Sequence, residues 1–167
     1  MTTKTSYSWT QDTPWGTLRI SATTDGVHSV QLHAKGGHRR LDASAPAAVR
    51  KIADKFDRFF AGEVKVIDDV DVDLSSLDNE FQRKVLVTLR KRVGAGKTIS
   101  YGALAEAVGH PGAARAVGSA MARNPVPIIV PCHRVLASGG GLGGYGGGLD
   151  MKRGLLELEG ALQELGV

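Results

Sequence analysis

Cysteine is almost absent from this 167-residue chain, which contains only Cys132. A single cysteine excludes an intrachain disulfide and a zinc site built from several cysteines, so the thiol is either an inert core residue or a reactive one. Long apolar runs are lacking too, because no stretch approaches the ~20 residues that a membrane span needs. Residues 1–6 also lack the apolar core of a secretory signal. We therefore expect a cytoplasmic protein that contacts no membrane.

Acidic residues are scarce in one half of the chain. Residues 79–153 contain 11 Lys and Arg but only 3 Asp and Glu, whereas the remainder contains 10 and 14. The net charge of +4 therefore combines a basic region with an acidic one. A concentrated basic region favours contact with a polyanion such as nucleic acid, although a solvated basic helix face would give the same count. The 42% of apolar residues is enough for a globular core.

The first part of the chain predicts a small sheet with one helix. Short strands are expected at residues 7–10, 16–22 and 27–34, and Asp25-Gly26 is a strong turn signal between the last two. Five apolar residues then recur at helical spacing before Gly62 ends the helix: Val49, Ile52, Phe56, Phe59 and Phe60. One face of this helix should pack against the sheet.

Residues 64–74 alternate between apolar and polar side chains and predict another strand. Residues 75–78 resemble a linker, which places a domain boundary there. The histidines at 28, 33 and 38 are not set at metal-ligand spacing. We therefore interpret residues 1–75 as a scaffold domain without chemistry of its own and predict no metal site.

Residues 79–167 predict a second, mostly helical domain. Its first helix is expected to begin after Asp78 as the N-cap and to end at Gly94. Ser100 would cap a short helix over residues 101–108, and a tight glycine- and proline-containing link leads to a helix over residues 113–123. Two short helices joined in this way predict a helix-turn-helix. The last helix should begin with Asp150 as its cap.

The helix over residues 113–123 has an unusually small outer face. Its inner face is predicted to hold Ala113, Ala116, Val117, Ala120 and Met121. Its outer face is predicted to hold Ala114, Arg115, Gly118, Ser119, Ala122 and Arg123. A nearly bare backbone with two arginines suits close approach to a sugar-phosphate wall, in the minor groove and without sequence preference. A small-residue helix packed tightly on a neighbour would show the same pattern.

Cys132 lies in the run Pro131-Cys132-His133-Arg134 and precedes a loop with eight glycines among residues 138–148. A cysteine attacks as its thiolate and needs a nearby base or positive charge to form it. Adjacent side chains on an extended segment point to opposite faces, so this sequence alone leaves both activation and inert burial open. The glycine-rich loop formally satisfies a nucleotide-binding pattern, but such a match is nearly automatic in this composition. We predict no cofactor.

The sequence resembles the O6-alkylguanine-DNA alkyltransferases, also called methylated-DNA–protein-cysteine methyltransferases. Five segments carry the resemblance, in family order and spacing: Ile99-Ser-Tyr101-Gly, Ala113-Ala-Arg115-Ala-Val-Gly118, Asn124-Pro-Val-Pro127, Ile129-Val-Pro131-Cys-His-Arg134-Val, and Gly144-Tyr145-Gly-Gly-Gly148. The resemblance as a whole covers about residues 79–160. The resemblance implies an α/β (α+β) fold with a small N-terminal sheet-plus-helix domain, ribonuclease H-like, ahead of the helical domain with the active-site cysteine.

The resemblance also implies the reaction. A damaged guanine, and by extension an O4-alkylthymine, is flipped out of duplex DNA and its alkyl group moves irreversibly to Cys132 in a single turnover by a monomeric protein. His133 would take the thiol proton through a water, Glu159 would orient His133, Tyr101 would donate to guanine N3, and Asn124 would brace the turn before the cysteine. Arg115 would enter the stack in place of the lost base.

A base pocket follows from the same resemblance. Its predicted residues are Val135, Tyr145, Gly146, Met121 and Pro127, with backbone groups of Cys132 and Val135 receiving the exocyclic amine and amides near Tyr145 and Gly146 facing the alkylated oxygen. Gly146 stands where some relatives have serine, so only an amide donor remains there. Zinc-binding relatives use cysteines that this chain lacks.

Two other functions are also compatible with these residues. A cysteine hydrolase built on Cys132, His133 and Glu159 would turn over an acyl substrate repeatedly and need no DNA. An alkyltransferase-like protein would bind the lesion without reacting, but those relatives carry a different residue at the cysteine position.

Overall fold

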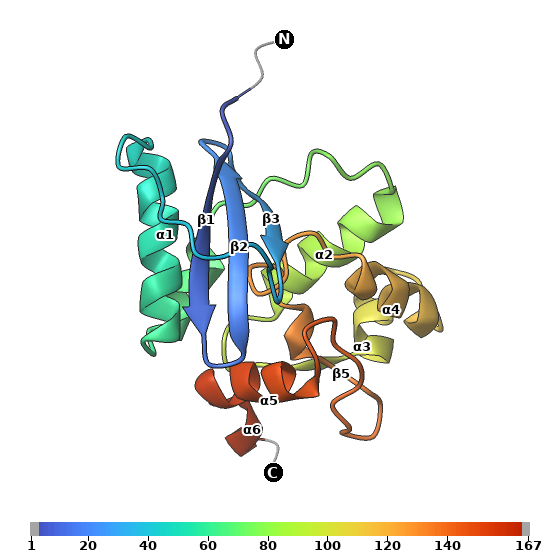
Figure 1. Cartoon of the computed structure of the whole chain (residues 1–167). Coiled ribbons are helices and arrows are strands. Elements are labelled where there is room, and N and C mark those ends of the chain that lie inside the picture. Colours follow the sequence, from blue (N-terminus) through green and yellow to red (C-terminus); the bar gives the residue numbers. More distant parts are fainter. Residues whose placement is uncertain (1–3, 165–167) are drawn as a thin grey trace.

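The computed structural model describes residues 4–164, which begin with a three-stranded antiparallel sheet in the order β1-β2-β3 (Figure 1). The strands are β1 (Tyr7–Thr13), β2 (Gly16–Thr23) and β3 (Gly26–Gln31). Alternate residues Leu18, Ile20 and Ala22 of β2 are buried, as expected for a sheet with one covered face. The predicted turn at Asp25-Gly26 is confirmed, with Thr23 paired to Gly26.

Helix α1 (Ala47–Phe60) packs against this sheet as predicted. Val49, Ile52, Phe56 and Phe59 are buried, at the spacing that puts them on one face of a helix. In Figure 1 the sheet lies between α1 and the group of helices α2, α3 and α4.

The strand predicted for residues 64–74 is wrong. Residues Val64–Asp69 form the 3₁₀ helix η1, and only Val72 makes an isolated bridge to Val27. The reason is burial: Ile67 and Val70 are three residues apart, so one turn of 3₁₀ helix places both in the core, whereas alternation would expose one. This turn also directs Asp68 toward the second half of the chain.

The second half is mostly helical, as predicted. It contains α2 (Glu80–Arg92), α3 (Tyr101–Ala107), α4 (Ala114–Ala122), the 3₁₀ turn η2 (Cys132–Arg134), α5 (Leu149–Leu158) and α6 (Ala161–Glu164). The cap of α3 is Ser100, whose hydroxyl accepts from the Ala103 amide at 3.0 Å. Two predicted caps are wrong: Asn79, not Asp78, caps α2, and Gly148 precedes α5, with Asp150 inside its first turn.

A short parallel pair was not foreseen in the sequence. Strand β4 (Ile99–Ser100) pairs with β5 (Val135–Leu136), which follows η2 directly. This pair holds the start of α3 beside the end of the cysteine turn. Tyr101, the first residue of α3, is thereby placed near Cys132.

Most of the buried apolar residues form one large cluster that runs from Trp9 in β1 to Leu155 in α5, and a smaller cluster holds Leu136, Leu156, Ala161 and Leu162. Residues on both sides of the predicted boundary at 75–78 belong to the large cluster, so the two halves share a core. Within residues 4–164, no helix is long and apolar enough to cross a membrane.

Candidate active site

Cys132 is the first residue of η2 and lines a cavity of about 240 Å³. The thiol-bearing residue is only 7% exposed, and its amide donates to the Val130 carbonyl at 2.8 Å. Three separate elements complete the wall of the cavity: α3, α4 and the glycine-rich loop. The other lining residues are Tyr101, Gly118, Met121, Ala122, Gly144, Tyr145 and Gly146.

The turn before the cysteine is held by Asn124. Its side-chain amide donates to the Val130 carbonyl at 2.9 Å, and its side-chain oxygen accepts from the Val126 amide at 3.0 Å. These two hydrogen bonds fix the conformation of the segment that links α4 to η2. Ile128 within it has a φ of 75°, a left-handed conformation that a branched side chain rarely adopts without such support.

His133 and Glu159 meet although 26 residues separate them. The imidazole Nε2 lies 3.0 Å from Glu159 Oε1, and both side chains are fully buried. Glu159 is the C-cap of α5, so the end of that helix aims its carboxylate at the cysteine turn. Because the ionised carboxylate can only accept, Nε2 carries the proton and Nδ1 has the free lone pair. Nδ1 is buried and meets no hydrogen-bonding group in the described part of the chain.

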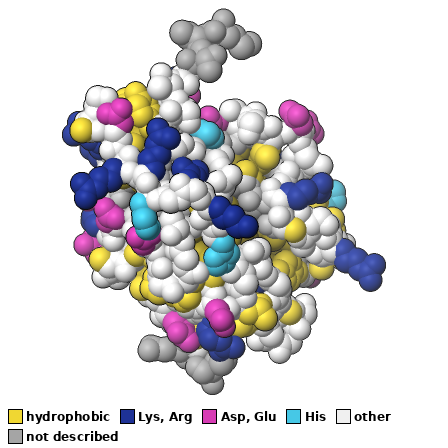
Figure 2. All heavy atoms as spheres, viewed as in Figure 1, with side chains coloured by type: hydrophobic (Ala, Val, Ile, Leu, Met, Phe, Trp, Pro, Cys, Tyr) yellow, Lys and Arg dark blue, Asp and Glu magenta, His cyan; other side chains and the backbone are white. Residues whose placement is uncertain are grey.

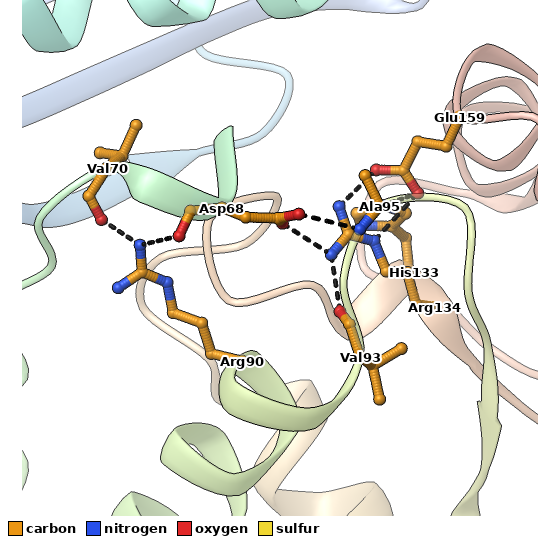
Figure 3. Close-up of polar contacts among 8 residues, drawn as sticks. All are labelled: Asp68, Val70, Arg90, Val93, Ala95, His133, Arg134 and Glu159. Atoms are coloured by element: carbon orange, nitrogen blue, oxygen red, sulfur yellow. Dashed lines mark hydrogen bonds and ion pairs between the residues drawn. The ribbon is translucent and has the colours of Figure 1, made fainter. Parts of the chain in front are cut away.

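Arg134 was missed as a functional residue, and it is the largest fully buried side chain of the described residues. Its guanidinium donates two hydrogen bonds to the Glu159 carboxylate, from Nε to Oε1 at 3.0 Å and from Nη2 to Oε2 at 2.6 Å. Its Nη1 donates to the Val93 carbonyl at 2.8 Å and to Asp68 Oδ1 at 3.1 Å (Figure 3). A bidentate arginine fixes the plane of a carboxylate, so Arg134 orients Glu159 and, through it, His133.

The protonation states of these groups follow from their surroundings. Burial raises the pKa of Cys132 to about 11, against the smaller opposing effects of an Asn124 hydrogen bond and the Lys152 charge. Burial lowers the pKa of His133, although Glu159 opposes this shift. Burial raises the pKa of Glu159, but His133 and Arg134 outweigh it and bring it down to about 2. At neutral pH the site therefore holds a thiol, a neutral imidazole and a carboxylate.

Lys152 is a second buried charge that sequence reasoning missed. Its ammonium donates to the carbonyls of Val135 at 2.7 Å and Gly144 at 3.1 Å. Burial lowers the pKa of Lys152 to about 8, opposed by the charge of Cys132. It lies on the same buried face of α5 as Leu155 and Leu156, and this spacing is the one signal in the sequence that could have revealed its burial.

The tyrosines of the predicted set both line the cavity. Tyr101 is half-buried, while the Tyr145 hydroxyl is buried and its ring lies edge-on to His133 with centroids 6.5 Å apart. Met121 and Gly146 also line the cavity, as expected. Val135 and Pro127 are buried but are not among its lining residues.

The outer face of α4 is largely as predicted. Arg115, Ser119, Ala122 and Arg123 are exposed, and Ala114 and Gly118 are partly exposed. Ala116 was expected on the inner face but is exposed, because the core needs only the stripe of Val117, Ala120 and Met121. Gly118 and Ala122 line the cavity as well, so this small-residue face separates the surface from Cys132.

Sequence comparison places these features in a family. Residues 80–161 match the family model described as 6-O-methylguanine DNA methyltransferase, DNA binding domain. A methylated-DNA–protein-cysteine methyltransferase of Mycobacterium bovis is 49% identical over 114 residues, which cover 68% of this chain and 67% of the relative. One of Shigella flexneri is 42% identical over 137 residues, covering 81% and 77%.

The chain belongs to the methylated-DNA–protein-cysteine methyltransferase family. A crystal structure of Mycobacterium tuberculosis OGT in complex with DNA has a TM-score of 0.75 and 39% identity over 91% of both chains. A crystal structure of a single-residue variant of the M. tuberculosis O6-methylguanine methyltransferase has a TM-score of 0.76 and 36% identity over 94% of both chains. The mixed α/β fold is therefore that of this family, and the protein is a DNA-binding methyltransferase that repairs DNA by alkyl transfer.

Proposed function

We propose that this methyltransferase takes the alkyl group from O6 of a flipped-out guanine onto Cys132, once per protein molecule. The observation that carries the proposal is the position of Cys132. The chain's single thiol lines a cavity whose walls are the small-faced helix α4 and the glycine-rich loop, and it sits beside a buried His133–Glu159 pair. An O4-alkylthymine presents a similar alkylated oxygen and belongs to the same proposal.

The chemistry starts from a thiol, since burial holds the pKa of Cys132 at about 11. The lone pair on His133 Nδ1 takes the thiol proton through a water, and the thiolate attacks the alkyl carbon. The new S–C bond forms as the C–O6 bond breaks. The electron pair of that bond goes to the guanine, which gains one proton for the one that the thiol lost. No step regenerates the thiol, so the protein is spent.

Other residues bind the base and the developing charge. Tyr101 lines the cavity and would donate to guanine N3, which becomes more negative as the bond breaks. Asn124 keeps the turn before Cys132 in place through its two backbone contacts. Backbone groups of Cys132 and Val135 would receive the exocyclic amine, and the amides near Tyr145 and Gly146 would approach the alkylated oxygen closely because glycines lack side chains.

DNA would reach the cavity along α4. Arg115, Arg123 and Ser119 are exposed on a face whose remaining residues are alanine and glycine, which favours close contact with the sugar-phosphate backbone of a widened minor groove. Arg115 would occupy the gap left by the flipped nucleotide. These contacts are independent of sequence and suit a monomer. A reducing compartment such as the cytoplasm would keep the lone thiol free.

The test follows the DNA product. A limiting amount of protein is mixed with excess duplex oligonucleotide containing O6-methylguanine, and the restored guanine is quantified by chromatography after digestion. We expect product formation to stop at one guanine per protein molecule and to be absent with Cys132→Ser. Formation of more than one guanine per protein molecule would show that Cys132 is regenerated and would contradict the proposal.

A further inference from the structure

An aspartate from the N-terminal half reaches the network around His133. Asp68, in η1, accepts a hydrogen bond from Arg134 Nη1 at 3.1 Å across 66 positions of sequence. The same guanidinium holds Glu159, and Glu159 holds His133, so the four side chains form a continuous chain (Figure 3). Asp68 is the outermost member, with a side chain that is 30% exposed, while the others are buried.

Asp68 is fixed firmly in this place. Its Oδ2 accepts from the Ala95 amide at 2.9 Å, and its own carbonyl accepts from Arg90 at 3.2 Å. The carboxylate thus bridges two atoms of the C-terminal half, the Ala95 amide and the Arg134 guanidinium. Such a double anchor holds a charge at a set distance from Arg134, unlike a mobile surface ion pair.

The charges in the network explain why an aspartate is needed. Arg134 and Glu159 alone cancel each other, which would leave no net negative charge to stabilise an imidazolium on His133. With Asp68 ionised, Arg134, Glu159 and Asp68 carry a net charge of −1, which balances the +1 of the protonated His133, while the thiolate that forms on Cys132 balances the charge of Lys152. The groups that face His133 are Glu159, Arg134, Lys152, Tyr145 and Cys132, and the cations among them, Arg134 and Lys152, oppose its protonation.

We propose that Asp68 is a positioning residue for alkyl transfer: it neutralises Arg134, so that the charge of Glu159 remains available to the imidazolium that forms when Cys132 loses its proton. This inference rests on the proposed function of His133 as the proton acceptor. It gives the N-terminal half a part in the reaction, whereas the sequence indicated only a scaffold.

The experiment compares Asp68→Asn with Asp68→Glu and with the matched control Asp69→Asn, which removes an exposed charge from the next residue of the same turn. Two rates are measured between roughly pH 6 and pH 9, because this range spans the reference pKa values of histidine and cysteine. One is methyl transfer from the damaged oligonucleotide under single-turnover conditions. The other is alkylation of Cys132 by iodoacetamide in the free protein, where the thiolate displaces iodide and no DNA takes part.

We expect Asp68→Asn to slow both rates at neutral pH by up to about tenfold, because a charge in direct contact shifts a pKa by about one unit and Asp68 acts on His133 through Arg134. DNA affinity and the circular dichroism spectrum should be unchanged. Asp68→Glu should recover most of both rates, and Asp69→Asn should equal the unsubstituted protein. If Asp68→Asn does not fold, the test rests on Asp68→Glu. This variant keeps the negative charge beside Arg134, so both of its rates should be near those of the unsubstituted protein.

Three results would overturn this role of Asp68: unchanged rates in Asp68→Asn, loss of methyl transfer without any change in the iodoacetamide rate, or Asp68→Glu as slow as Asp68→Asn. The iodoacetamide rate separates the two proposals. If the unsubstituted protein transfers no methyl group, the proposed function fails, and the effect of Asp68→Asn on iodoacetamide alkylation still tests whether Asp68 supports the His133 base.

Discussion

At the scale of single residues, Glu159 carries the most distinctive electrostatic property of the site. It is a buried carboxylate with two partners, His133 and Arg134, and their charges and hydrogen bonds outweigh burial and bring its pKa to about 2 from an ordinary 4.5. A depressed folded-state pKa means that the carboxylate stabilises the fold above about pH 4.5. That stabilisation is lost as the pH falls toward 2.

This linkage predicts the acid stability of a Glu159→Gln variant. The difference in free energy of unfolding between the unsubstituted protein and the variant should be largest near neutral pH. It should shrink by on the order of 3 kcal/mol as the pH falls from about 4.5 to 2, because only the carboxylate titrates. Urea unfolding across this range measures it, with the exposed Glu157→Gln as the control. A difference that does not change with pH would contradict the assigned pKa.

Some residues of the site could be predicted from the sequence and others could not. Cys132 and His133 stand in a specific sequence motif, and Glu159 followed from the resemblance to the family; the structure brings His133 and Glu159 together. Arg134, Asp68 and Lys152 were missed because a charged side chain is ordinarily exposed. The contact between Asp68 and Arg134 spans 66 positions, and no local pattern encodes such a contact, whereas the burial of Lys152 had a local signal only in its helical spacing with Leu155 and Leu156.

At the scale of elements, periodic segments were predictable and short irregular ones were not. Helix α1 was expected from its five-residue stripe, while the alternation in residues 64–74 wrongly indicated a strand. Tertiary packing decided that segment, since Ile67 and Val70 both had to be buried. The β4–β5 pair is two residues long in each strand, which is too short for a pattern. The outcome matters because η1 carries Asp68 and β4 places Tyr101.

Helix α4 offers a prediction in which stability and binding change in opposite directions. A Cβ at Gly118 would meet no atom within 4 Å, and glycine inside a helix costs roughly 0.5–1 kcal/mol relative to alanine. Gly118→Ala should therefore raise the melting temperature. It should weaken binding to methylated duplex DNA, because the added methyl group stands at the wall between cavity and surface.

Thermal unfolding and a fluorescence anisotropy titration measure these two effects. Gly154→Ala is the matched control: its Cβ would lie 2.2 Å from the Trp15 ring, so it should lower the melting temperature. If Gly118→Ala bound DNA as tightly as the unsubstituted protein does, α4 would not be part of the DNA-binding surface.

At the scale of the whole molecule, the shared core joins the N-terminal half to the chemistry. Buried residues from β1 to α5 form one cluster, and Asp68 extends this connection to the active-site network. The charge asymmetry seen in the sequence does not appear as one basic patch on the face shown in Figure 2. On the face shown in Figure 2, Lys and Arg side chains are spread out, with Asp and Glu side chains among them. The sequence could predict a basic half, but the folded arrangement of its charges depends on which ones are buried.

Cys132, as the final acceptor of the alkyl group, is the residue on which every proposed step depends. The most direct measurement is intact-protein mass spectrometry after mixing with an oligonucleotide that contains O6-methylguanine, followed by peptide mapping. We predict a gain of one methyl group, located on Cys132, and no gain in Cys132→Ser. An unmodified thiol beside restored guanine, or a methyl group on any other residue, would contradict this role of Cys132.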